Sequence, residues 1–126
     1  MKIIETKNAP AAIGPYSQAV FLGGLIYTSG QIPIDPATGR IETYTIIGQT
    51  EQIIKNLSAV LTEASSSLDR VIKTTCYLKN IEDFGAFNEV YAKHFTSKPA
   101  RSCVEVSNLP KGALAEIEVI AEVEKR

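Results

Sequence analysis

Only two segments of this chain carry the three- and four-residue apolar spacing of an amphipathic helix, and this scarcity limits the possible folds more than any other feature. The first segment runs from about Gly48 to Ala64, and its stripe consists of Ile53, Leu57, Val60, Leu61 and Ala64. The second stripe is aromatic and consists of Phe84, Phe87, Tyr91 and Phe95. Asp83 or Glu82 lies near the start of the second helix, and Pro99 lies beyond its end.

Short β-rich runs supply the strands. The runs 19–22 and 25–28 are joined by Gly23-Gly24, a pair that permits positive φ in a tight hairpin. Two more strands are expected at 101–106 and 115–123, because breaker residues separate these runs. The chain therefore begins and ends with strands.

The run 71–78 lies between the two helical segments and is rich in β-branched residues. Ile72, Cys76 and Leu78 are assigned to one face of this strand, and Val71 and Tyr77 to the other. Apolar residues on both faces predict a strand that is buried on both sides.

Two segments read as loops. Residues 31–39 are punctuated by Pro and Gly, so we expect a surface loop with no regular element running through it. Ser65-Ser66-Ser67 is expected to end the first helix. Two helices can cover only one face of the sheet, so we expect another subunit to bury the second face.

Composition narrows the class of protein. The 126 residues are 44% hydrophobic and 21% charged, which indicates a single globular domain spanning 1–126. The net charge of −1 does not suit a nucleic-acid-binding protein. Cys76 and Cys103 form neither a CxxC pair nor a zinc motif. The start, Met1 to Glu5, is too short for a signal-peptide core, and no membrane-spanning run is found, so a cytoplasmic location is expected.

Arg101 is the first candidate for chemistry. At the start of a strand it shares a face with Cys103 and Glu105, and its planar fork suits a carboxylate. A surface ion pair is the competing interpretation. Cys103 could be a nucleophile activated by Arg101, or simply a buried cysteine, since the only histidine, His94, forms no dyad motif with it.

Glu116 begins the last strand and could activate a water molecule. It shares its face with Glu118, Glu122 and Ile120, and three such acids are also typical of a solvated face.

Tyr16 and the pair Ser29-Gly30 flank the glycine hairpin, so antiparallel pairing should bring them together around a small polar ligand, unless Gly30 and its neighbours merely form turns. Asn88 either reaches the same pocket or is a solvated helix residue.

Five motifs resemble the RidA family of reactive intermediate deaminases over essentially the whole length. They are NAPAAIGPYSQ at 8–18, YTSGQIP at 27–33, FNEVY at 87–91, PARSCVEV at 99–106 and LPKGA at 109–113. The connection 95–99 is shorter than in many relatives, so we expect the rim of the cleft and the substrate preference to differ from theirs.

The resemblance implies a chorismate-mutase-like α+β fold: a two-layer sandwich with a mixed sheet and two helices on one face. It also implies a homotrimer with a central barrel of sheets and sites between subunits. The implied enzyme is a 2-iminobutanoate/2-iminopropanoate deaminase that needs no cofactor or metal and hydrolyses 2-imino acids, such as 2-aminoacrylate, to 2-keto acids and ammonia.

The resemblance also assigns roles to residues. Arg101 would hold the carboxylate, Glu116 with the backbone at Cys103 would activate water, and Tyr16, Ser29, Gly30 and Asn88 would line the pocket. Two alternatives are kept: a binding module that senses a metabolite without turnover, and an endoribonuclease or translation inhibitor, which the weakly acidic charge disfavours.

Overall fold

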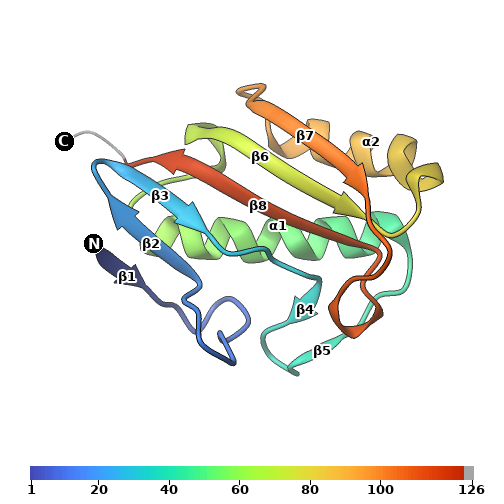
Figure 1. Cartoon of the computed structure of the whole chain (residues 1–126), viewed down its shortest axis with the longest axis horizontal. Coiled ribbons are helices and arrows are strands. Elements are labelled where there is room, and N and C mark those ends of the chain that lie inside the picture. The colour runs from blue at the N-terminus through green and yellow to red at the C-terminus, as the bar shows by residue number, and fades with distance from the viewer. Residues whose placement is uncertain (124–126) are drawn as a thin grey trace.

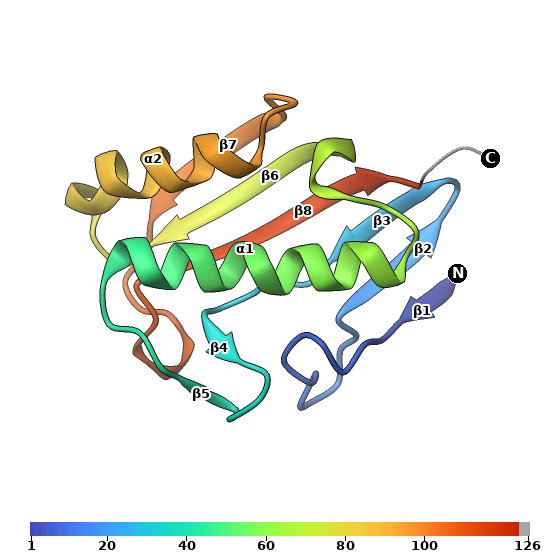
Figure 2. The same cartoon turned by 180° about the vertical axis from the view of Figure 1, so that it is seen from behind.

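The computed structural model describes residues 1–123, which form two layers, a six-stranded sheet and two helices packed on one of its faces (Figures 1 and 2). The sheet contains β1 (Lys2–Ile4), β2 (Ala19–Leu22), β3 (Leu25–Thr28), β6 (Val71–Leu78), β7 (Ala100–Glu105) and β8 (Ala115–Glu122). The helices are α1 (Ile46–Glu63) and α2 (Phe84–His94). A small second sheet pairs β4 (Ile34–Asp35) with β5 (Arg40–Ile41).

The strand order is β1-β2-β3-β8-β6-β7, and every neighbouring pair is antiparallel except β6 and β7. That parallel pair is joined through α2, because a parallel connection has to cross over the sheet. Figure 2 shows both helices on the same side of the sheet. The prediction of an α+β fold with a mixed sheet and two helices on one face is confirmed.

The core fills the space between the helices and the sheet. Both predicted helical stripes point into it, and Leu57 of α1 and Phe87 of α2 have no exposed surface. The inward residues of β8, Ile117, Val119 and Ala121, are likewise buried. Burial of each large side chain contributes about 1.5–3 kcal/mol, so this single layer holds the elements together.

Helix α1 begins two residues before the apolar spacing indicates. Thr45 is its N-cap, and the Thr45 Oγ1 accepts a hydrogen bond from the Gly48 backbone N–H at 3.0 Å. This bond satisfies one of the free donors of the first turn. The helix ends at Glu63, and Ser65 has a left-handed φ of 61°, so the serine run does terminate the helix as expected.

The expected division of β6 into two faces is wrong at its first two residues. The register shifts between Val71 and Lys73, which makes Ile72 the extra residue of a β-bulge. Val71 is therefore buried on the helix-covered face with Cys76 and Leu78, whereas Ile72 is 44% exposed. Simple alternation could not reveal the bulge.

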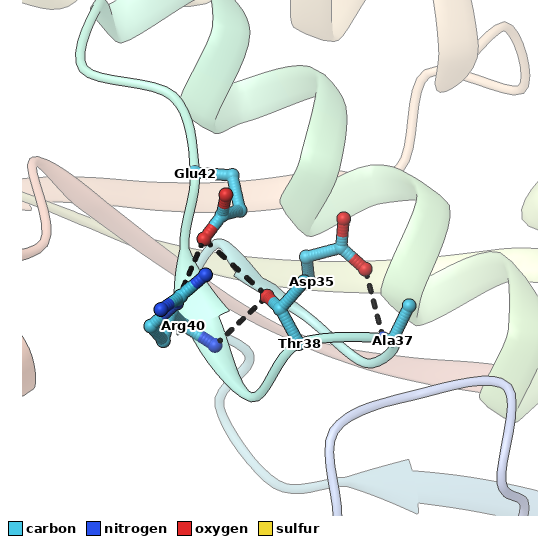
Figure 3. Close-up of polar contacts among 5 residues, drawn as sticks. All are labelled: Asp35, Ala37, Thr38, Arg40 and Glu42. Carbon is cyan, nitrogen blue, oxygen red and sulfur yellow. Dashed lines mark hydrogen bonds and ion pairs between the residues drawn. The ribbon is translucent and has the colours of Figure 1, made fainter.

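The expected loop at 31–39 also contains regular structure. Asp35 and Thr38 stabilise a turn between β4 and β5: Asp35 Oδ1 accepts from the Ala37 N–H at 2.9 Å, and Thr38 Oγ1 accepts from the Arg40 N–H at 3.2 Å (Figure 3). Gly39 has a φ of 74°, which closes the turn. The Pro and Gly residues that indicated a loop instead shape a short hairpin.

Strand β1 was not expected. It is three residues long, which is too short to show an alternation of apolar and polar residues, and only Ile4 is buried. In the part of the chain that the structure describes, neither helix has the length and apolar character needed to cross a membrane.

Candidate functional site

The first group of candidate residues lies where β3 leaves the sheet. The Ser29 backbone N–H donates to the Gln18 carbonyl at 2.9 Å, and the Ser29 hydroxyl donates to the Ser17 carbonyl at 2.6 Å. These bonds bring the two ends of the hairpin together. Tyr16 and Gly30 consequently line the same hollow of about 310 Å³, to which Lys111 also contributes.

Glu116 joins this group by packing directly on Gly30. Gln31 and Ile117 exchange two backbone hydrogen bonds, of 2.9 and 3.2 Å, which place the start of β8 beside Gly30. A Cβ atom at Gly30 would lie only 2.0 Å from Glu116 Oε2. Glycine is thus the residue that leaves room for the carboxylate.

The Glu116 carboxylate is half-buried, and this changes its acidity. Loss of contact with water raises the pKa of Glu116, and the negative charge of Glu118 raises it further. Glu118 itself accepts a hydrogen bond of 2.7 Å from the Tyr77 hydroxyl. A carboxylate with a raised pKa is a stronger proton acceptor near neutral pH.

Buried polar residues on α1 and β2 hold the loops of this group, and we did not identify them from the sequence. Asn56 Nδ2 donates to the carbonyl oxygens of Ile32 and Ile34, at 3.3 and 2.9 Å. Gln49 Oε1 accepts from the Leu114 N–H at 2.8 Å, just before β8. Both residues lie within the inward face of α1, and a polar residue in an apolar stripe is the signal that could have identified them.

Gln18 has the same role for the N-terminal loop. It accepts from the Thr6 N–H at 2.7 Å and donates to the carbonyl oxygens of Thr6 and Pro10 at 3.0 and 2.8 Å. The segment that carries Tyr16 is therefore tied to β2 by a buried amide.

The second group centres on Arg101 at the start of β7. Arg101 Nη1 donates to Asn88 Oδ1 at 2.7 Å, and the guanidinium carbon lies 4.7 Å from the centre of the Tyr91 ring. A hollow of about 500 Å³, with largely apolar walls that include Phe95 and Pro99, adjoins it. Within residues 1–123, no carboxylate pairs with Arg101, so the surface ion pair considered above is not found.

Cys103 lies on the same face of β7 as Arg101 and directly opposite Cys76 of β6. Burial raises the pKa of the Cys103 thiol, an effect that exceeds the opposing influence of the Arg101 charge. His94 is paired with Glu51 at 2.5 Å instead. The raised pKa and the pairing of His94 with Glu51 thus disfavour an activated nucleophile at Cys103.

The two groups lie on opposite faces of the sheet. Arg101 is in register with Thr74, whose side chain is buried beneath the helices, whereas Glu116 is in register with Tyr77 on the face that carries no helix. Residues in register share a face. A single chain therefore does not bring Arg101 and Glu116 together.

Among the described residues, no group of three or more His, Cys, Asp or Glu side chains could hold a metal ion. The chemistry open to both groups is that of a cation, a carboxylate, and hydroxyl and amide groups.

Comparison with known proteins decides the family. The sequence model of the family described as endoribonuclease L-PSP matches residues 6–123. The chain belongs to the RidA/RutC family. The five motifs that indicated this family lie within the matched residues.

Members of the RidA/RutC family resemble this chain over nearly their whole length. A Lactococcus lactis protein, named AldR as a proposed regulator, is 60% identical over 98% of both chains. The crystal structure of the Rid family protein YyfA of Yersinia pestis has a TM-score of 0.94 and 54% identity, and covers 97% of this chain and 98% of that one. The structure of TdcF from E. coli with bound serine has a TM-score of 0.93 and 43% identity, and the match covers 98% of this chain and 100% of that one.

Proposed function

We propose that the protein hydrolyses 2-imino acids and their enamine tautomers, such as 2-aminoacrylate and 2-iminobutyrate, to 2-oxo acids and ammonia. The observation that carries this proposal is the state of Arg101. Its guanidinium is fixed by Asn88 and Tyr91, yet no carboxylate of the described residues pairs with it. A fixed cation that pairs with no carboxylate of residues 1–123 suits an anionic ligand.

In the proposed reaction, Arg101 binds the substrate carboxylate. Asn88 takes one N–H of the guanidinium, so the remaining donors can hold both carboxylate oxygens. Two bonds fix the direction of the adjacent imine carbon, which orients it for attack. The ligand class is supported by the structure of TdcF with bound serine, because serine also carries a carboxylate next to a nitrogen-bearing carbon.

Glu116 is the proposed base. It removes a proton from water as the water oxygen bonds to the imine carbon, and the imine nitrogen gains a proton. The C–N bond of this intermediate then breaks, the C=O bond forms, and ammonia leaves with the second proton. The raised pKa of Glu116 suits such a proton acceptor. Water supplies the oxygen of the 2-oxo acid and both protons that ammonia gains, and Glu116 gives back the proton that it removed.

The proposed site contains residues of two chains, because Arg101 and Glu116 lie on opposite faces of one sheet. The sheet face that carries no helix has a row of apolar side chains that is exposed in a single chain. The row consists of four residues in register on neighbouring strands: Ile3, Val20, Tyr27 and Ile120. Ile3 is 59% and Tyr27 40% exposed. Contact between copies would bury this row, and a homotrimer is the assembly that we propose.

The direct test generates the imine in place with a dehydratase and measures ammonia release with and without the protein. Arg101→Ala should abolish most of the acceleration, because the substrate loses its anchor. Arg40→Ala is the matched control, since Arg40 is an exposed arginine paired with Glu42 at 3.1 Å and should leave the rate unchanged. An Arg101→Ala variant that is as fast as the wild type would refute the proposal.

Mixed assemblies test whether the site is shared between chains. Arg101→Ala and Glu116→Gln chains are each expected to be inactive alone. When they are dissociated and reassembled together, some sites combine an intact Arg101 with an intact Glu116, and part of the activity should return. A mixture that stays inactive, with mixed assemblies shown by mass spectrometry, would contradict the shared site.

A binding module without turnover is the second candidate, and the name of the Lactococcus lactis relative favours it. Both candidates use the Arg101 carboxylate site, so the ammonia assay separates them. Tight binding of a 2-oxo acid without any acceleration of imine hydrolysis would favour the binding module.

A further inference from the structure

The guanidinium of Arg101 rests on an aromatic surface that is itself fixed. Its central carbon lies 4.7 Å from the centre of the Tyr91 ring and 5.4 Å from that of Phe84. A cation over an aromatic face is attracted by the electron density of the ring. These contacts therefore restrict the planar guanidinium of Arg101 to a defined position.

The Tyr91 ring is held at its edge and by its neighbours. Its hydroxyl is hydrogen-bonded to the Thr74 hydroxyl at 2.8 Å, and Thr74 on β6 is fully buried. The ring centres of Phe87, on α2, and of Phe95, just beyond the end of α2, lie 5.9 and 4.5 Å away. Helix α2 and strand β6 thus fix the ring from two sides.

Thr74 is also the strand neighbour of Arg101. The two residues are in register on the parallel strands β6 and β7. The sheet therefore sets the position of the Arg101 backbone and, through the Thr74 hydroxyl and the Tyr91 ring, also that of the guanidinium at the end of the side chain. Asn88, one turn before Tyr91, also holds the guanidinium, because its Oδ1 accepts a hydrogen bond of 2.7 Å from Arg101 Nη1.

We propose that Tyr91, held by the hydroxyl of Thr74, is a positioning residue that orients the Arg101 guanidinium for the carboxylate of the ligand. This inference rests on the proposed function, because it assumes that Arg101 binds a carboxylate. Tyr91 touches no reacting atom, so its loss weakens binding of the anion and leaves the rate of the chemical step nearly unchanged.

The test compares two ligands of nearly the same shape, one charged and one not: 2-oxobutyrate, a product of the proposed reaction, and its uncharged amide. In Tyr91→Leu, the dissociation constant of 2-oxobutyrate should rise about 2- to 30-fold, the range of a cation–π contact. Binding of the amide should not change. Tyr44→Phe is the control, since Tyr44 is 81% exposed.

Conservative variants isolate the hydroxyl pair without removing the ring. Tyr91→Phe and Thr74→Val should each weaken 2-oxobutyrate binding less than Tyr91→Leu does, and the double variant should be no worse than either single one, because both remove the same bond. Thr74→Ser keeps the hydroxyl and should bind like the wild type. In turnover, the same variants should raise KM with little change in kcat.

Four outcomes would overturn the inference. Variants that bind 2-oxobutyrate like the wild type would show that the ring does not position Arg101. Equal losses for the acid and the amide would show a general structural defect. A wild-type protein that neither binds 2-oxobutyrate nor hydrolyses imines would refute the proposed function and this inference together. Normal wild-type turnover with unaffected Tyr91 variants would refute the inference alone.

Discussion

Gly30→Ala is the sharpest test of the site, because it adds one methyl group where the structure has no room. The new carbon would lie 2.0 Å from Glu116 Oε2, 2.8 Å from Cδ and 3.1 Å from Cγ. Ordinary contact requires roughly 3.5 Å, so the carboxylate has to move by about 1.5 Å. Gly30 does not have a positive φ, so alanine fits its backbone and only the clash is tested.

The expected effect on stability is small and that on activity is large. Glu116 is a flexible side chain that can turn away from the methyl group, at a cost of about 0.5–1.5 kcal/mol for a strained rotamer. A displaced base loses much of its contribution, which is typically on the order of 100- to 10,000-fold. We therefore expect kcat to fall about 100-fold.

The assay is ammonia release from 2-iminobutyrate generated in place, with thermal unfolding measured on the same samples. Gly85→Ala is the matched control, since nothing lies within 4 Å of its added carbon, and it should keep full activity. Combining Gly30→Ala with Glu116→Gln should be no slower than Glu116→Gln alone. Full activity in the folded Gly30→Ala protein would refute the role given to this contact.

Four further outcomes follow from the structure. The value of kcat/KM should fall with decreasing pH as Glu116 becomes protonated. The Glu118→Gln variant should show this fall at lower pH, because the charge of Glu118 raises the pKa of Glu116. Profiles of kcat/KM against pH for both proteins check this. Phe87→Ala should destabilise the fold by about 3–5 kcal/mol in urea unfolding, since the ring is fully buried. Asn56→Ala should cost about 1–3 kcal/mol and also slow turnover, because the carbonyl oxygens beyond Gly30 lose their donor. Arg40→Ala should change stability by less than about 1 kcal/mol, as expected for an exposed ion pair.

Features that depend only on neighbouring residues in the chain could be predicted from the sequence. The Gly23-Gly24 turn lies where expected, with φ angles of 62° and 82°, and both helical stripes face the core. These features depend on local spacing alone. The bulge at Ile72 and the hairpin around Asp35 could not be predicted, because each depends on a partner strand that local spacing does not identify.

For the same reason, only part of the candidate site could be predicted from the sequence. The convergence of Tyr16 with Gly30 follows from one hairpin and could be anticipated. The separation of Arg101 from Glu116 depends on how β6, β7 and β8 pair, and alternation within a strand does not show which of its faces is shared with the next strand. The contact of Glu116 with Gly30 required the bridge between Gln31 and Ile117.

The strand order leaves β1 and β7 as the outer strands of the sheet, and both discourage the growth of a longer sheet. Strand β1 has three residues and begins with Lys2, and β7 carries Arg101 and Glu105. Short or charged outer strands are how proteins resist edge-to-edge aggregation into fibrils. A newly folded chain can thus expose an apolar sheet face while its edges resist uncontrolled polymerisation, which favours closed assemblies over open ones.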